Sequence, residues 1–417
     1  MSGGRLADDC FALPRGVDWT PVDVALSRLK EGLAPVCAVE QVALGDAAGR
    51  ILAADSVALR DAPPQANAAV DGYAFRHAAA EAEAELTCLE GRAAAGHAYG
   101  DPVPAGSCLR ILTGAELPAG TDTVVLDEDT TRDADRVRFP RPKRPGANVR
   151  PAGEDARSGE ALLAAGRRLG GQDLARAAAA GVAQFAVHRR LRVAILSTGD
   201  ELLEPGADPA KAGIFDANRP MLAALATAQG FEVVDLGRAA DRAEAVRDAF
   251  DRGAREADAI VTTGGASAGD EDHVSRLLRT EGRLETWRIA VKPGRPMAMG
   301  LWRGVPVFGL PGNPVAAFVC FAVFARPGLV RLAGGDWPEP RGFPVPAAFE
   351  KRKKPGRREF LRARLDAAGR AEVFHSEGSG LIGGLTWADG LVDLPDGALE
   401  IAPGDPVRYI PFASFGL

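Results

Sequence analysis

The sequence predicts a multidomain protein that combines an open, mostly parallel α/β sheet with β-rich parts. Its 417 residues exceed the usual domain size of about 100 to 150 residues. Between residues 191 and 332, near-continuous apolar runs, typical of buried parallel strands, alternate with helix patterns. Short β-like runs separated by proline and glycine lie on both sides of this segment. We therefore expect an α/β domain with helices on both faces of its sheet, a small β-rich domain and a C-terminal β-barrel.

The N-terminal part opens with a helix signal and then becomes β-like. Thr20, Pro21 and Asp23 fit an N-cap, a proline at the first helical position and an acidic first turn. We interpret the helix that follows, which carries Val24, Leu26 and Leu29, as a linker or packing helix. From about residue 48 to residue 139 the pattern predicts the small β-rich domain, and a second helix around residues 174–180 ends at a glycine.

The central segment gives the clearest alternation of elements. A helix is expected from Asn218 to Gly230, and Asp241 with Glu244 resembles a capping box at the start of the next helix. A final apolar helix closes the segment, and the chain after Pro338 is again proline-rich and strand-like. The expected strands of the segment are 193–196, 231–236, 259–261, 287–291, 297–301 and 307–310.

Composition excludes several functional classes. A net charge of −6 and a pI near 5.6 argue against a surface that coats nucleic acid. The longest apolar run, residues 315–325, is too short to cross a bilayer, and no signal sequence is apparent. The five scattered cysteines form no C-x-x-C pair, which favours reduced thiols. We expect a cytoplasmic protein without nucleic-acid or membrane partners.

The turn after residues 259–261 carries the strongest chemical signal. Gly264, Gly265 and Gly269 allow backbone N–H groups to approach an anion at the start of the next helix. Acidic residues 270–272 follow, and carboxylates of this kind hold divalent cations. The pattern predicts phosphate and metal chemistry.

Three further loops follow apolar strands: residues 197–201, 292–296 and 310–314. If the sheet is parallel, all four loops gather at one edge, where ligands bind in open α/β sheets. They would supply acids from two loops, cations from the third and rigid glycine–proline backbone from the fourth.

Three short motifs admit other interpretations. Ser267 lies in a G-x-S-x-G sequence, so a serine hydrolase with Asp336 and His375 is an alternative, although nearby acids would oppose an oxyanion. Residues 378–383 match G-x-G-x-x-G, but we expect no helix after them, which argues against dinucleotide binding. The basic residues from 351 to 358 are typical of a solvated loop, yet they could hold phosphate.

In the first half, residues 67–74, 113–115 and 153–155 look like ordinary turns when taken alone. Together with the four loops, however, they occur in an order that resembles the molybdopterin molybdenumtransferase family, which includes the bacterial MoeA proteins and the E-domain of gephyrin. The seven motifs span almost the whole chain. They are 71–74, 113–115, 153–155, 197–201, 264–272, 292–296 and 310–314.

The resemblance implies an elongated homodimer of four-domain subunits with an active site shared between subunits. The corresponding domains are an elongated linker domain (1–47 and 150–188), a small β-rich domain (48–149), the α/β molybdopterin-binding domain (189–335) and the C-terminal β-barrel (336–417). The implied reaction is Mg²⁺-dependent: adenylylated molybdopterin and molybdate give molybdenum cofactor and AMP. Molybdopterin adenylyltransferase and molybdoenzyme maturation proteins are expected partners.

The resemblance also implies roles for individual residues. Implied catalytic residues are Asp71, Thr113, Asp155, Glu201, Asp241, Asp272 and Lys292, with Glu201 and Asp272 as metal ligands. Implied substrate-binding residues are Gly199, Asp200, Gly264, Gly265, Ser267, Gly269, Arg288, Pro311, Gly312, Asn313, Pro314 and Arg358. Physical chemistry agrees, because a divalent ion and cationic side chains would bring two mutually repelling oxyanions together.

The sequence departs from the family pattern at a few positions. Ala66, Ala68 and Val70 stand where Asp, Ser and Met are frequent, and Arg288 stands where Lys is frequent. Lost carboxylate and hydroxyl groups would weaken anion or metal contacts. Two other functions stay open: an adenylyltransferase on the same α/β scaffold, and a non-catalytic cofactor carrier or scaffold.

Overall fold

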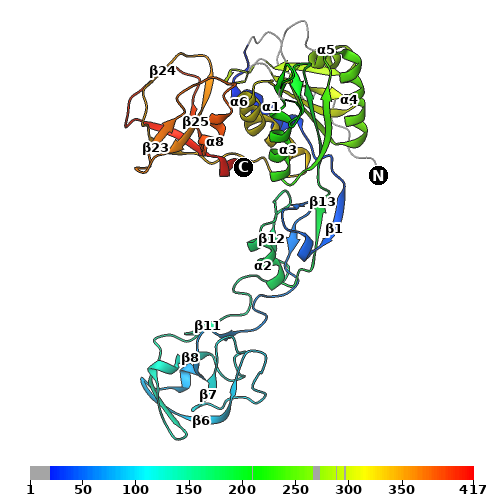
Figure 1. Ribbon diagram of the computed structural model, residues 1–417. Helices are drawn as coiled ribbons and strands as arrows, with labels where there is room; N and C mark the ends of the chain where they lie inside the picture. Colours follow the sequence, from blue (N-terminus) through cyan, green and yellow to red (C-terminus); the bar gives the residue numbers. More distant parts are fainter. Residues whose placement is uncertain (1–18, 209, 266–272, 288, 295–296) are drawn as a thin grey trace.

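The computed structural model describes residues 19–208, 210–265, 273–287, 289–294 and 297–417. The chain forms an elongated, bent molecule (Figure 1). The α/β part and the C-terminal part lie side by side at one end, and the small β-rich domain lies at the other. A narrow linker domain separates the two ends. This mixed α/β, sheet-rich architecture agrees with the expected fold class.

The linker domain is built from two distant parts of the chain. Its three-stranded sheet has the order β1-β13-β2, and β3 pairs with β12 next to it. The domain boundary expected at residue 48 is therefore wrong, because β2 and β3 pair with this domain and Leu52 and Ala58 lie in its core. The elements are β1 (Val39–Ala43), β2 (Ile51–Leu52), β3 (Ser56–Val57), β12 (Ala161–Leu163), α2 (Gly171–Ala179) and β13 (Gln184–His188).

The small β-rich domain is a six-stranded sheet with the order β8-β5-β7-β6-β10-β9, accompanied by the short pair β4 and β11. Apolar residues pack on both faces of the sheet, in two separate clusters. Its strands are β4 (Asn67–Ala68), β5 (Gly72–Phe75), β6 (Glu83–Ala93), β7 (Ser107–Ile111), β8 (Thr123–Leu126), β9 (Thr131–Asp133), β10 (Arg136–Pro140) and β11 (Val149–Arg150).

The α/β domain contains a six-stranded sheet with the order β17-β14-β18-β22-β21-β19. The first four strands are mutually parallel, whereas β21 and β19 pair in antiparallel fashion. The strands are β14 (Arg192–Thr198), β17 (Glu232–Ala239), β18 (Ala259–Thr263), β19 (Arg283–Trp287), β21 (Met297–Trp302) and β22 (Val305–Leu310). The helices are α3 (Asn218–Ala228), α4 (Ala243–Glu256), α5 (His273–Thr280), α6 (Pro314–Cys320) and α7 (Arg326–Leu332).

Alternation along the central strands places helices on both faces of this sheet. In β14, Val193 and Ile195 belong to the cluster that contains α3 and α6, whereas Ala194 and Leu196 belong to the cluster that contains α4 and α5. Successive side chains of a strand point to opposite faces, so an unbroken apolar run buries both. The apolar strands of the sequence are explained by this double burial.

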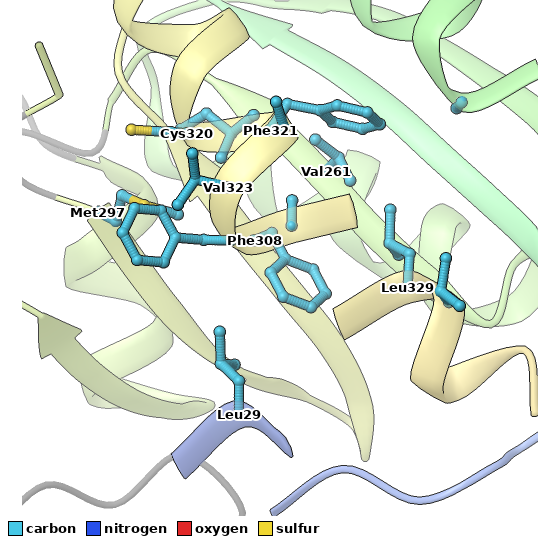
Figure 2. Close-up of a cluster of buried hydrophobic side chains, with 14 of the residues drawn as sticks. Leu29, Val261, Met297, Phe308, Cys320, Phe321, Val323 and Leu329 are labelled. Carbon is cyan, nitrogen blue, oxygen red and sulfur yellow. The ribbon is translucent and has the colours of Figure 1, made fainter. Parts of the chain in front are cut away.

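The N-terminal helix α1 (Val22–Gly32) belongs to the α/β core and not to the linker domain, which corrects the expected assignment of residues 1–47. Its buried residues include Val22 and Leu29, and Val24, expected on the apolar stripe, is 41% exposed. Figure 2 shows Leu29 approaching the cluster of Phe308 and its neighbours. The chain therefore packs against the α/β domain first and enters the linker domain afterwards, at β1.

Among the residues that the structure describes, a single helical stretch, Pro314–Leu332, is long and apolar enough to cross a membrane by length and composition. The stretch consists of α6, a π-helical turn (Phe321–Ala325) and α7. In the structure 94% of its apolar window is buried, against the sheet and α1. We assign it as a core helix of the α/β domain.

The C-terminal part forms a curled sheet with the order β20-β25-β27-β29-β23, and β26 pairs with β25. The bridge between Ala347, just after β23, and Ala371 of β26 links the last strand back to the β25–β26 pair, so continuous pairing around a closed barrel is not formed by the described residues. The elements are β20 (Val291–Lys292), β23 (Phe343–Pro346), β24 (Lys351–Lys353), β25 (Arg358–Leu365), β26 (Ala371–Val373), α8 (Gly383–Trp387), β27 (Gly390–Leu394), β28 (Leu399–Ile401) and β29 (Pro406–Pro411).

Candidate active site

The topology of the α/β sheet creates a crevice at the carboxyl ends of β14 and β18. The chain passes from β14 to β17 on one side, and then from β17 to β18 on the other side of β14. The loops after β14 and β18 therefore diverge, and ligands of open α/β sheets bind at such a switch point. The first predicted loop and the glycine-rich turn both leave the sheet here.

A cleft of about 710 Å³ lies at this edge. Three of the four predicted loops contribute to it, and the β15–β16 pair (Leu202–Leu203 and Ile214–Phe215) forms one side. The C-terminal part contributes Gly380 and Ile382. The remaining lining residues are Thr198, Glu201, Asp216, Ala217, Asn218, Thr263, Gly264, Gly265, Pro311, Gly312, Asn313 and Pro314.

Glycine is required where the loops approach one another most closely. A Cβ atom on Gly264 would lie 2.5 Å from the backbone oxygen of Thr198, and the residue has a φ of +85°. A Cβ atom on Gly199 would lie 2.5 Å from a carboxylate oxygen of Glu201. The carboxylate of Glu201 therefore folds back over its own loop at the cleft wall. These contacts explain why the two loops carry glycine.

Asn218 fixes two walls of the cleft to each other. Its Nδ2 donates to Thr263 Oγ1 at 2.8 Å and to the carbonyl of Gly312 at 2.7 Å. Thr263 Oγ1 in turn donates to the carbonyl of Pro311 at 3.0 Å. The end of β18, the start of α3 and the loop after β22 are joined through this buried network.

Two buried oxygens at the cleft lack hydrogen-bond partners among the described residues. They are Thr198 Oγ1 and Asn218 Oδ1, on side chains that are 5% and 8% exposed. Buried polar atoms are normally hydrogen-bonded, so each of these atoms has capacity for a ligand. Together with the Glu201 carboxylate they offer oxygen donors, the type that Mg²⁺ prefers. The donor set fits magnesium in kind, but no group of three or more His, Cys, Asp or Glu side chains gathers as a metal site among the residues with described positions.

Asp241 contributes to the loop differently from the expected capping box. Its Oδ2 accepts from the backbone N–H of Asp200, and Asp200 Oδ1 accepts from the backbone N–H of Asp241, both at 3.2 Å. Helix α4 begins at Ala243 after Arg242, without a side-chain cap. The expected cap is therefore wrong, because the carboxylate of Asp241 joins the loops after β14 and β17.

Lys292 does not line the cleft, which corrects the expectation that all four loops gather at one place. After β19 the chain leaves the α/β sheet, and β20 pairs with β25 of the C-terminal part. Lys292 there contacts Glu377 and lies 3.6 Å from Glu359, in a neighbouring cavity of about 220 Å³. Lys351 pairs with the same two acids. The positive charge of Lys292 is therefore already balanced by acidic side chains of its own chain.

Arg358 is also placed elsewhere, although it was expected to bind substrate. Both its Nε and its Nη2 donate to Asp393 at 2.7 Å, and Nη1 donates to Asp23 of α1 at 2.6 Å. These hydrogen bonds raise the pKa of the guanidinium. Arg358 connects α1 to the C-terminal sheet. The basic run around it forms strand β24 and ion pairs, not a solvated loop.

Asp71 and Thr113 form a compact pair in the small β-rich domain. Asp71 Oδ1 accepts from the backbone N–H and from the hydroxyl of Thr113, both at 2.7 Å. These two hydrogen bonds lower the pKa of the exposed carboxyl. Asp155 is exposed near the boundary with the linker domain, where its N–H donates to the carbonyl of Ala62. All three lie in domains separated from the cleft of their own chain (Figure 1).

Several predicted site residues lie outside the described residues. These are Ser267, Gly269, Asp272 and Arg288. The hydrolase alternative can still be judged from its other two members. Asp336 and His375 line different cavities, and no hydrogen bond joins them in the described part of the chain. A catalytic triad requires that hydrogen bond, so this alternative loses its support.

The G-x-G-x-x-G motif contains cleft residues that sequence reasoning did not identify. Helix α8 does follow the motif, contrary to expectation, but it has only five residues. The flanking strands β26 and β27 both pair antiparallel with β25, so the unit is not dinucleotide-binding βαβ. Asn218, Thr198 and Phe215 were likewise not singled out as ligands. The signal for Asn218 was the polar start of α3, whereas Thr198 lies within the first predicted loop, at the end of β14.

Family models match three consecutive parts of the chain. Residues 20–181 match the MoeA N-terminal region (domain I and II). Residues 194–331 match the probable molybdopterin binding domain, and residues 344–412 match the MoeA C-terminal region (domain IV). The cleft and the distant Asp71–Thr113 pair therefore both lie in regions that match these family models.

Relatives of known name match over nearly their whole length. A molybdopterin molybdenumtransferase of Haemophilus influenzae is 33% identical over 397 residues, which cover 94% of this chain and 98% of the relative. Molybdopterin molybdenumtransferase 2 of Mycobacterium tuberculosis is 34% identical, with 89% and 95% covered. A crystal structure of the molybdopterin biosynthesis MoeA protein from Pyrococcus horikoshii superimposes with a TM-score of 0.82 at 28% identity, covering 94% of this chain and all of that one.

Proposed function

Because the chain belongs to the molybdopterin molybdenumtransferase family, we propose that it inserts molybdenum from molybdate into molybdopterin during molybdenum cofactor biosynthesis. In the finer form of the proposal, the substrate is adenylylated molybdopterin, the reaction depends on Mg²⁺, and AMP is released in the cytoplasm. The observation that carries the proposal is the cleft of about 710 Å³ at the switch point, where two buried oxygens lack partners among the described residues.

Each wall of the cleft suits one part of such a substrate. Backbone of the glycine turn and of the 311–314 loop can approach phosphate groups closely. The exposed apolar side chains of Ile214, Phe215 and Ile382 can cover a heteroaromatic ring. Bound Mg²⁺ would neutralise charge on the two oxyanionic substrates. Glu201 and Thr198 Oγ1 would hold it, while Asn218 keeps the surrounding loops in place.

We further propose that the active site is completed by a second copy of the chain. The Asp71–Thr113 pair is exposed and pre-organised, but it lies at the far end of its own subunit. In a symmetric dimer the small domain of one subunit can face the α/β cleft of the other. The carboxylate of Asp71 would then join Glu201 at the cleft.

The transfer reaction is tested with purified protein, adenylylated molybdopterin, molybdate and Mg²⁺. AMP release and cofactor formation are measured together. We expect Glu201→Gln to reduce turnover strongly, whereas the control Glu232→Gln, at the opposite edge of the same sheet, retains activity. Binding of the substrate without AMP release by the unaltered protein would favour a carrier. Formation of the adenylylated compound from ATP would favour an adenylyltransferase.

Shared active sites are tested by mixing inactive variants. Asp71→Asn and Glu201→Gln are each expected to be inactive as homodimers. Random re-association of equal amounts makes about half of the dimers mixed, and each mixed dimer has one intact site out of two. Activity should therefore return to about a quarter of the wild-type value. No recovery, despite verified formation of mixed dimers, would mean that both residues do not act in one shared site.

A further inference from the structure

A second cavity lies where the linker domain, the α/β domain and the C-terminal part meet. Its volume is about 420 Å³, and it shares no lining residue with the cleft. The linker contributes Arg167 and Arg168, the α/β domain contributes Gln229 and Arg326, and the C-terminal segment contributes Trp337 among others. Three arginines at one cavity form an unusual lining for a protein with a net charge of −6.

Arg326 is a buried cation without a balancing acid. Its side chain is 4% exposed, Nε donates to the carbonyl of Ala322 at 3.2 Å, and Nη2 donates to the carbonyl of Pro338 at 2.8 Å. The guanidinium also lies over the ring of Phe415. Within the described ranges it forms no ion pair with an acidic side chain. Burial of an uncompensated charge is costly.

Arg168 adds a second positive charge beside it. Its Nη1 donates to the carbonyl of Gln229, and it too forms no ion pair with an acid in the described part of the chain. Burial, together with the charge of Arg168, lowers the pKa of Arg326 to about 10. Both groups are still protonated at neutral pH. The two guanidiniums therefore repel each other across the cavity.

The other charged groups of the cavity do not neutralise this pair. Arg167 is already bound to Asp173 at 2.8 Å. Asp336 is exposed, its backbone N–H donates to Gly166, and its carboxylate lies within ion-pair distance of neither Arg168 nor Arg326. The cavity keeps a local excess of positive charge.

We propose that this cavity is a binding site for a small oxyanion of the phosphate or carboxylate type. Guanidinium groups present paired N–H donors that match the oxygens of both classes. An anion between Arg168 and Arg326 would relieve their repulsion and balance the buried charge of Arg326. Since three parts of the chain form the walls, binding would also stabilise their packing. The site is independent of the proposed molybdenum transfer.

The test uses the full chain and two probes, inorganic phosphate and acetate, at constant ionic strength. Binding is measured by calorimetry and by the fluorescence of Trp337, with Trp337→Phe identifying the signal of this cavity. We expect saturable binding of at least one probe. Arg326→Met and Arg168→Gln should each weaken it by tenfold or more, whereas Arg136→Gln, an exposed arginine in the small domain, should leave it unchanged.

The outcomes separate the cavity from the catalytic cleft. A preference for phosphate or for acetate identifies the class of natural ligand. Arg168→Gln, which alters an exposed side chain, gives the same test without disturbing the core. Absence of a Trp337-dependent signal with both probes, or unchanged binding in the folded Arg168→Gln variant, overturns the proposal. If the Arg168→Gln variant loses anion binding but retains AMP release, the cavity and the catalytic cleft function independently.

Discussion

Substitution of Gly264 by alanine tests the close packing on which the cleft depends. Gly264 has a φ of +85°, and an added Cβ would lie 2.5 Å from the carbonyl oxygen of Thr198 on the neighbouring loop. Gly304, in the turn between β21 and β22, provides a matched control. Its φ is +82°, but an added Cβ would meet no atom within 4 Å. Both substitutions place alanine at a positive φ, and only Gly264→Ala adds a steric clash with Thr198.

The magnitude follows from this comparison. Placing alanine in the left-handed region costs roughly 1–2 kcal/mol, and Gly304→Ala should lose about that much stability. At Gly264 the contact is also far shorter than an ordinary van der Waals separation, and the atom that must move belongs to the backbone of Thr198, the last residue of β14. Overpacking of this kind adds typically 1–3 kcal/mol. We expect Gly264→Ala to lose about 2–5 kcal/mol in total.

Urea unfolding gives the loss of stability, and AMP release below the unfolding transition gives the effect on the site. Gly264→Ala should reduce turnover strongly because the loop after β14 must shift, whereas Gly304→Ala should retain near-wild-type turnover in its folded state. Equal stability losses in the two variants, with equal turnover, would refute the argument that close loop packing forms the cleft.

Three further predictions concern hydrogen bonds and ion pairs of the described residues. Asn218→Ala removes two buried hydrogen bonds, so we expect a loss of about 1–3 kcal/mol in urea unfolding and a raised KM for the pterin substrate. Thr113→Val removes one of the hydrogen bonds that lower the pKa of Asp71, so carboxyl NMR titration should show that pKa rising towards its ordinary value. Burial lowers the pKa of Lys351, but its acidic partners Glu377 and Glu359 raise it overall. The resulting stabilisation is present below the unfolded pKa near 10.5 and is lost as pH rises through the folded pKa. Glu359→Gln should therefore reduce the loss of stability at alkaline pH, measured by unfolding.

The α/β core could be predicted because its signals are local. Unbroken apolar strands imply burial on both faces, and the structure divides the residues of β14 between two helix-covered clusters. The loops after β14, β18 and β22 were expected to meet because carboxyl ends of parallel strands share an edge, and they do line one cleft. The spacing of apolar residues and the parallel direction of the strands were sufficient to predict this part of the site.

The errors concern pairings between distant segments. The sequence around Lys292 looks like another cleft loop, but its strand pairs with β25, more than sixty residues later. Helix α1 has an ordinary amphipathic pattern that does not specify which core receives it. The polar start of α3 reads as a helix signal, and only the folded chain shows that Asn218 connects two loops. Local patterns specify an element, whereas its partner depends on packing of the whole chain.

The connection between the small domain and the linker restricts how Asp71 can reach a substrate. Two chain segments connect the small domain to the linker, and they are joined by the bridge between Ala62 and Ala156 and by the pairing of β4 with β11. A paired, two-segment connection resists sharp bending more than a single flexible segment does. Folding the small domain back onto its own cleft would require those pairings to break. Contribution of Asp71 by a second subunit requires no such break, which is why we favour a shared active site over a hinged monomer.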